Sequence, residues 1–142
     1  FSLDEQIRNV ILLLEPKWSA KNIELELELQ PIRYIGDEEL LKQVWINLIE
    51  NAIKFSEQNG CIRISTEKSG AAVITTISDT GIGIQEKDRS KIFERFYKAD
   101  KSRSKEGNGL GLPIVKKIIE LHHGEIDFHS QLGAGTTFII KL

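Results

Sequence analysis

A chain of 142 residues with 40% apolar residues can form one compact domain and is too apolar to be a disordered tail. Its net charge of −2 argues against a dedicated nucleic-acid-binding protein, which usually carries a basic stripe. The single cysteine, Cys61, excludes an internal disulfide and a zinc site built on several cysteines. No apolar run approaches the roughly 18–20 residues of a membrane span. Because the chain starts at Phe1 instead of Met, we expect it to be a piece of a longer protein.

The N-terminal half predicts two helices separated by a strand. Ser2 and Glu5 form a capping-box pattern before an amphipathic stretch, which predicts a helix over residues 3–21, bent near Pro16. Ile23 and three leucines then alternate with glutamates over residues 23–29, as in a half-buried strand. Asp37 can cap a second helix over residues 38–55.

The C-terminal half predicts a hairpin, a loop, a helix and a second hairpin. Residues 62–64 and 73–77 read as paired strands around KSGA. Residues 79–111 are rich in glycine and charge, which is typical of a functional loop or lid. A helix over 112–122 and strands over 125–130 and 136–142 follow. This order predicts a two-layer α/β sandwich: a mixed, mostly antiparallel sheet of about five strands with about three helices on one face.

One face of the second helix carries side chains that suit a metal ion and phosphates. Asn47, Asn51 and Lys54 lie at helical spacing beside the apolar stripe, although asparagine is a mediocre helix former. Their amide oxygens could bind Mg²⁺ and the lysine could contact phosphates, while Phe55 offers an aromatic face to a base. A solvated helix face explains the same pattern, so this segment alone leaves both interpretations open.

Two glycine-containing segments raise the same choice between a turn and a ligand site. Asp79 follows a strand and precedes Gly81 and Gly83, and this pattern either forms a turn or reads a ligand that approaches the backbone. Gly107, Gly109 and Gly111 run into a helix, whose N-terminus favours an anion. The chain has no Gly-Lys pair, which excludes a P-loop.

Five segments occur in an order that resembles a known family. They are NLIENAIKF (47–55), DTGIGI (79–84), IFERFYK (92–98), GNGLGL (107–112) and GAGTTF (133–138). They are similar to the N, G1, F, G2 and G3 boxes of the ATP-binding catalytic domain of bacterial sensor histidine kinases. That domain belongs to the superfamily shared with gyrase, chaperone and mismatch-repair ATPases and has the Bergerat-type fold. The resemblance covers residues 1–142, with a lid over about 93–109.

The resemblance implies roles for individual residues. Asp79 would accept a hydrogen bond from the adenine amine, with Thr136 helping through water, and Gly81 and Gly83 would let the base lie against the backbone. Asn51, with Asn47, would hold Mg²⁺, and Lys54 would contact phosphate. Arg95 or Lys98 would reach the γ-phosphate, and Gly107, Gly109 and Gly111 would clasp the triphosphate. The other nucleotide-site positions are Phe55, Ile84, Tyr97, Leu110 and Leu112.

The family's chemistry implies partners as well as a substrate. The γ-phosphoryl of ATP would pass to a histidine on a separate dimerisation domain, then to a response regulator, and ADP would leave. Asn47 stands where the gyrase-like ATPases keep a water-activating glutamate; the neighbouring Glu50 leaves that point open. His122, His123 and His129 are expected to be structural, so the acceptor lies outside this chain.

The same resemblance sets expectations for assembly and location, and two other functions stay open. We expect a monomeric fragment of a homodimeric parent, in a cytoplasmic domain of a membrane-anchored protein, with no nucleic-acid partner. A serine kinase of the anti-sigma type would share the boxes. A nucleotide-sensing module would bind ATP without transferring its phosphate. Transfer to a supplied helical domain, and the chemistry of the product, would separate the three.

Overall fold

The computed structural model describes residues 1–94 and 111–142. Its elements in chain order are α1 (Leu3–Leu13), α2 (Glu15–Ala20), β1 (Glu24–Leu29), α3 (Glu38–Phe55), β2 (Cys61–Ser69), β3 (Ala72–Asp79), α4 (Glu86–Arg89), α5 (Gly111–Leu121), β4 (Glu125–Gln131) and β5 (Gly135–Lys141). The predicted lid, residues 93–109, lies almost entirely outside the described residues.

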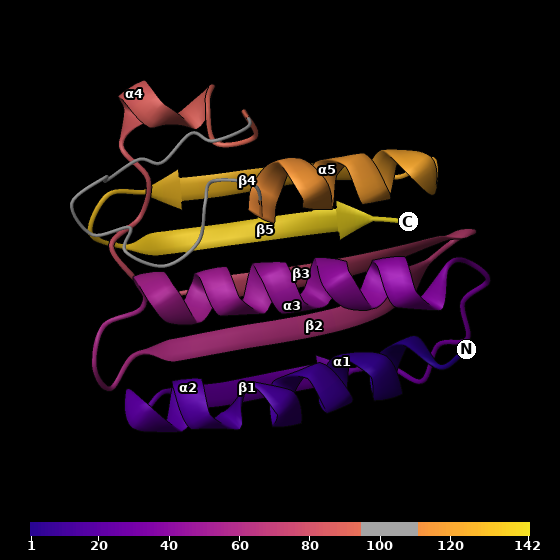
Figure 1. Cartoon of the computed structure of the whole chain (residues 1–142), viewed down its shortest axis with the longest axis horizontal. Helices are drawn as coiled ribbons and strands as arrows, with labels where there is room; N and C mark the ends of the chain where they lie inside the picture. The colour runs from indigo at the N-terminus through magenta and orange to yellow at the C-terminus, as the bar shows by residue number, and fades with distance from the viewer. Residues whose placement is uncertain (95–110) are drawn as a thin grey trace.

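The strands form one mixed sheet in the order β1-β2-β3-β5-β4 (Figure 1). β1 runs parallel to β2, and every other neighbouring pair is antiparallel. A parallel pair needs a long crossover, which α3 supplies between β1 and β2. The antiparallel β2–β3 and β4–β5 pairs are the two hairpins that the sequence predicted.

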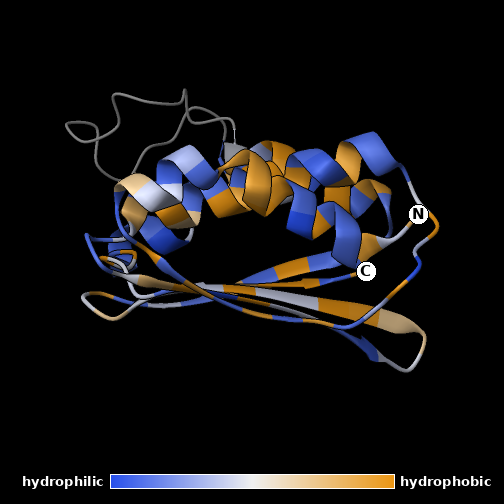
Figure 2. Cartoon of the chain, turned by 90° about the horizontal axis from the view of Figure 1, so that it is seen from below, coloured by the Kyte–Doolittle hydropathy of each residue, from blue (hydrophilic) through white to orange (hydrophobic). Residues whose placement is uncertain are grey.

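The helices α1, α2, α3 and α5 lie on one side of the sheet, so the described part of the chain has two layers (Figure 2). The inner face of α3 is fully buried and includes Leu41, Val44, Trp45 and Leu48. On β3 the alternating side chains of Val73, Thr75, Ile77 and Asp79 are buried as well. The predicted two-layer sandwich is therefore confirmed, and the strand period places Asp79 at the last buried position of β3.

The first predicted helix is two helices instead of one bent helix. α1 ends at Leu13 and α2 begins at Glu15, with Pro16 in the first turn of α2. Proline has no backbone N–H to continue the hydrogen-bond ladder of α1, but the first turn of a helix needs none. The chain therefore breaks at Leu14, before the proline. Among the described residues, no helix is both long enough and apolar enough to span a membrane.

Candidate functional site

Three segments that lie far apart in the sequence meet at one end of the sheet. The loop after β3 is held to the C-terminal end of α3 by a hydrogen bond from Ile82 N–H to Phe55 O, 3.2 Å long. The same loop accepts a 2.8 Å hydrogen bond at Ile82 O from Gly133 N–H, in the turn between β4 and β5. The N, G1 and G3 segments thus form one continuous surface, as a shared ligand site requires.

Asp79 lies at the centre of this junction and is 9% exposed. Its Oδ1 accepts hydrogen bonds from the backbone N–H of Gly81 at 2.8 Å and of Thr136 at 3.4 Å. Burial raises the pKa of Asp79, and the two hydrogen bonds oppose that rise. Within residues 1–94 and 111–142, Oδ2 has no hydrogen-bond partner and is not sealed from solvent. The site therefore offers one oriented acceptor, which suits an amine of a ligand.

The glycines of this loop are needed for contacts within the protein itself. A Cβ on Gly81 would lie 2.2 Å from Phe55 O, and one on Gly83, at φ +76, would lie 2.3 Å from Gln131 O. Gly135, which the sequence did not single out, has φ +106, and a Cβ there would lie 2.0 Å from Asp79 O. Close backbone packing thus explains these glycines, while the approach of a ligand to Gly81 and Gly83 stays a prediction.

α3 presents the predicted metal and phosphate ligands on its surface. Asn47 Oδ1 accepts a 2.7 Å hydrogen bond from Gln43, and Asn47 Nδ2 donates to Gly111 O at 3.3 Å. Asn51 is half-buried, and its amide forms no hydrogen bond with another described residue. Because Asn51 keeps its oxygen available, the residues present fit a hard cation that binds through one or two amide oxygens. The link from Asn47 to Gly111 places the start of α5 beside this face.

The C-terminal end of α3 borders a cavity of about 260 Å³. Its lining residues are Lys54, Phe55, Ser56, Glu57 and Ile82. The Lys54 ammonium lies 5.4 Å from the centroid of the Phe55 ring, and these two side chains offer a cation and an aromatic face side by side. A phosphate and a base are the chemical groups that such a pair can contact.

Lys21 stabilises this helix end, and the sequence analysis missed it. Its ammonium donates hydrogen bonds to three carbonyl oxygens, those of Ile53, Lys54 and Ser56, over 2.8–3.0 Å. A cation at a helix C-terminus satisfies carbonyls that have no partner within the helix. No local pattern could have found it, because Lys21 precedes these carbonyls by more than 30 residues.

Glu50 points toward a different neighbour from the candidate ligands. Its carboxylate forms a 2.7 Å ion pair with Lys17 of α2. This ion pair orients the Glu50 carboxylate toward α2.

The remaining predicted positions divide into two groups. Ile84 and Leu112 are partly buried and pack against the core. Six of the predicted site residues lie outside the described residues: Arg95, Tyr97, Lys98, Gly107, Gly109 and Leu110.

His122 caps α5 through a 2.8 Å contact between Nδ1 and Ile118 O, and its Nε2 accepts a 3.0 Å hydrogen bond from Asp37 N–H, in keeping with the expected structural role.

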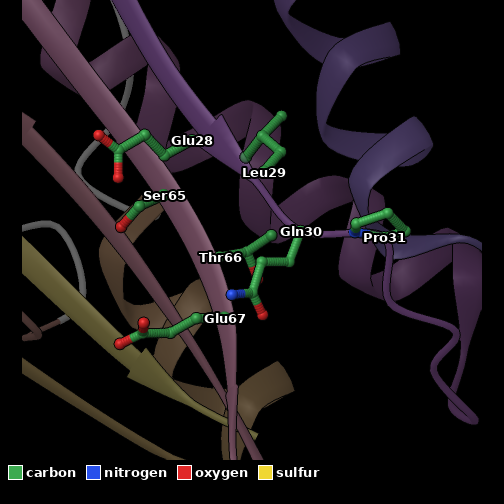
Figure 3. Close-up of a pocket in the computed structure, with 7 residues that line it drawn as sticks. All are labelled: Glu28, Leu29, Gln30, Pro31, Ser65, Thr66 and Glu67. Atoms are coloured by element: carbon green, nitrogen blue, oxygen red, sulfur yellow. The ribbon is translucent and has the colours of Figure 1, made fainter.

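A second, larger groove lies at the ends of β1 and β2 (Figure 3). It has a volume of about 450 Å³ and is lined by Glu28, Leu29, Gln30, Pro31, Ser65, Thr66 and Glu67. Two carboxylates would repel a triphosphate, and none of the predicted site residues lines this groove. The candidate site is therefore the Asp79 junction, where the N, G1 and G3 segments meet.

Comparison with known proteins shows the family and the fold of this chain. Residues 36–142 match the family described as "Histidine kinase-, DNA gyrase B-, and HSP90-like ATPase". The "Heme sensor protein HssS" of Staphylococcus saprophyticus is 39% identical over 138 residues, which cover 97% of this chain and 30% of that protein. The chain thus spans less than a third of that relative's length.

Solved histidine kinases share the whole fold. The mycobacterial sensor histidine kinase MprB has a TM-score of 0.90 at 29% identity, covering 100% of this chain and 95% of that chain. The catalytic domain of histidine kinase ThkA has a TM-score of 0.87 at 35% identity, covering 100% and 92%. ThkA has also been solved in complex with the response regulator protein TrrA. The family match covers residues 36–142, and the structural match covers the whole chain. The chain therefore belongs to the histidine kinase-, DNA gyrase B- and HSP90-like ATPases.

Proposed function

We propose that this chain binds Mg-ATP and transfers the γ-phosphoryl group to a histidine on a separate dimerisation domain of a sensor histidine kinase. Membership of this ATPase family implies ATP binding. The observation that carries the proposal is Asp79, the buried carboxylate whose Oδ1 is fixed by two backbone N–H groups. Its other oxygen can accept a hydrogen bond from the exocyclic amine of adenine, whereas guanine presents a carbonyl at that position.

The proposed binding mode assigns the base and the phosphates to different segments. The base would lie between Asp79 and Phe55, and Thr136 would assist through water. The triphosphate would extend along α3 toward Lys54, with Asn51 and Asn47 holding Mg²⁺, which neutralises phosphate charge when bound. Arg95, Lys98 and the glycines at 107, 109 and 111 would complete the phosphate contacts from segments outside the described residues.

The chain's own residues contribute positioning and charge to the transfer step. The neutral acceptor nitrogen attacks the γ-phosphorus, a P–N bond forms, and the P–O bond to ADP breaks with its electron pair on the β-phosphate oxygen. Phosphoryl transfer needs little covalent chemistry from the protein, so alignment of nitrogen, phosphorus and leaving oxygen sets the rate. The phosphoryl group would then pass to a response regulator, as the ThkA–TrrA complex suggests for this family.

Further features of the parent protein are proposed on the same basis. The chain corresponds to 30% of HssS, so the dimerisation domain and a membrane anchor would belong to the rest of the parent protein. The parent would be a homodimer. The catalytic domain itself would work in the cytoplasm, where ATP is available. MprB and ThkA are named as histidine kinases, which favours histidine over serine as the acceptor.

A labelling experiment tests the reaction. The domain is mixed with the dimerisation domain of its parent and with ATP labelled in the γ-phosphate. We expect label on the partner domain that is lost in acid and retained in alkali, as a phosphoramidate behaves, and almost none on the catalytic domain alone. Acid-stable label on the partner would support a serine kinase instead. ATP binding with no label would support the nucleotide-sensing module.

A further inference from the structure

Ser130, at the end of β4, connects the two sides of the candidate base-reading site. Its Oγ accepts a 2.7 Å hydrogen bond from Ile84 N–H, contacts Thr136 Oγ1 at 2.9 Å, and donates to Gly135 O at 3.2 Å. The backbone of Ser130 is held too, because the Arg89 guanidinium donates a hydrogen bond to Ser130 O. Neither Ser130 nor Arg89 belongs to the site residues that the sequence indicated.

Counting hydrogen atoms gives the one arrangement in which all of these bonds form at once. A serine hydroxyl has one hydrogen and two lone pairs. If that hydrogen goes to Gly135 O, both lone pairs are left to accept, one from Ile84 N–H and one from Thr136. All the bonds form together only when the Thr136 hydroxyl donates its hydrogen to Ser130. Thr136 Oγ1 then has lone pairs but no hydrogen left for any other group.

The same threonine is the residue that fixes Asp79. Its backbone N–H donates to Asp79 Oδ1, so the hydroxyl of Thr136 and the free Oδ2 of Asp79 both belong to this junction. With the Thr136 hydrogen committed to Ser130, both oxygens are acceptors. Where these two acceptors face position 6 of a purine, they favour an amino group, which donates hydrogen bonds, and disfavour a carbonyl, which can only accept them.

We propose that Ser130 is a positioning residue that sets the hydrogen-bond polarity of the base site and thereby its preference for a 6-amino over a 6-carbonyl purine. This inference rests on the proposed nucleotide-binding function and adds a residue that determines its specificity. Without the Ser130 hydroxyl, the Thr136 hydrogen is free to turn toward the ligand and to donate to the bridging water, which can then donate both of its own hydrogens, one of them to a carbonyl.

The test compares two nucleotides that differ at this position. Affinities for Mg-ATP and Mg-ITP are measured by isothermal titration for the wild-type domain and for Ser130→Ala. We expect the ratio of ATP to ITP affinity to fall about tenfold in the variant, the effect of about one hydrogen bond changing its direction. Ser130→Thr keeps the hydroxyl and should restore the ratio.

The chain offers a matched control on the neighbouring strand pair. Ser78 and Thr137 are directly opposite each other on β3 and β5, as Ser130 and Thr136 are on β4 and β5, and their hydroxyls lie 2.7 Å apart. Ser78→Ala removes an equivalent cross-strand hydroxyl pair without touching the Thr136 hydroxyl. We therefore expect Ser78→Ala to keep the wild-type nucleotide ratio.

Each outcome of the test has a distinct meaning. An equal loss of ATP and ITP affinity in Ser130→Ala would show a purely structural role and overturn the inference, as would an unchanged ratio. A wild-type domain that binds ATP and ITP equally would instead refute the base-reading role of Asp79. If Ser130→Ala does not fold, Ser130→Cys provides the same test, because a thiol is a weak acceptor.

Discussion

Replacing Asp79 by asparagine should abolish most nucleotide binding without unfolding the domain. The two backbone N–H groups that bind Oδ1 require an acceptor there, so the asparagine oxygen must occupy the Oδ1 position. The amide nitrogen then replaces Oδ2 and presents hydrogen atoms to the adenine amine, which also donates. The variant is nearly isosteric, so the change is electrostatic and not a change of shape.

The size of the effect follows from the bond that is lost. A hydrogen bond to a charged group contributes about 1.5–3 kcal/mol, and two opposed donors add a penalty to its loss. A total of about 3 kcal/mol corresponds to about a 150-fold weaker affinity for ATP. The variant should also gain affinity for ITP relative to ATP, since its amide can donate to the 6-carbonyl.

Asp79→Asn should not lower the folding stability of the free domain, although it weakens nucleotide binding. Burial raises the pKa of Asp79, so the ionised carboxylate is less stable in the folded than in the unfolded chain, and this cost is present at pH values above the folded pKa. Removing the charge should leave the free domain at least as stable at neutral pH. Thermal unfolding checks this, and isothermal titration with Mg-ATP checks the binding.

The control for this experiment is Asp127→Asn, which makes the same chemical change at an exposed position of β4. It should bind ATP like the wild type. An Asp79→Asn affinity within about threefold of the wild type would refute the reasoning, because the opposed donors would then have cost less than 1 kcal/mol. A large loss of stability would show instead that the charge is needed for folding.

Three further predictions concern metal, acid and backbone packing. Asn51→Ala should weaken Mg-ATP binding by about tenfold and metal-free ATP binding much less, as titrations with and without Mg²⁺ would show; equal losses would place the metal elsewhere. Hydrogen bonds from Ser2, then Arg8 and a backbone N–H, lower the pKa of Asp4 to about 2. Urea unfolding should therefore find Asp4→Asn about 1 kcal/mol less stable than the wild type at pH 7. This difference in stability should vanish as the pH falls from about 4 to about 2, because Asp4 is then protonated in both states. Gly135→Ala should cost more than about 2 kcal/mol of stability, whereas Gly133→Ala, which also has a positive φ but no neighbour within 4 Å, should cost less; equal costs would argue against the close contact with Asp79.

Local patterns were sufficient for the strands and for most of the helices, but not for the break at Leu14 or for the short helix α4, and they were sufficient to single out Asp79. Alternation along β3 and the helical stripe of α3 are properties of a few consecutive residues, and Asp37 caps α3 through a 2.9 Å bond to Leu40 N–H, as predicted. Asp79 could be singled out because a lone carboxylate ends an apolar strand and precedes two glycines. These signals require no knowledge of which strands pair.

Contacts between distant segments were beyond the same reasoning. Lys21 and Gly135 act on residues about 30 and 56 positions away, and only the fold brings them together. The glycines of the G1 segment also have a reason that the sequence could not reveal, because Gly81 and Gly83 pack against backbone from α3 and from the β4–β5 turn. Ser130 was missed for the same reason: its partners are the G1 loop and β5.

The position of Glu50 bears on whether this chain can hydrolyse ATP by itself. The family resemblance implies that Asn47 stands where the gyrase-like ATPases keep a water-activating glutamate, and its amide is hydrogen-bonded to Gln43 and to Gly111 O. Glu50 is the nearby carboxylate on α3 that could act as a base, yet its ion pair with Lys17 directs it toward α2. We therefore expect slow hydrolysis that Glu50→Gln leaves unchanged, measured as phosphate release under conditions where ATP saturates the domain. A drop of more than about tenfold would show that Glu50 activates water after all. If Glu50 does not activate water, the γ-phosphoryl group would be retained until the proposed acceptor, an imidazole nitrogen on the partner domain, is brought into line with it.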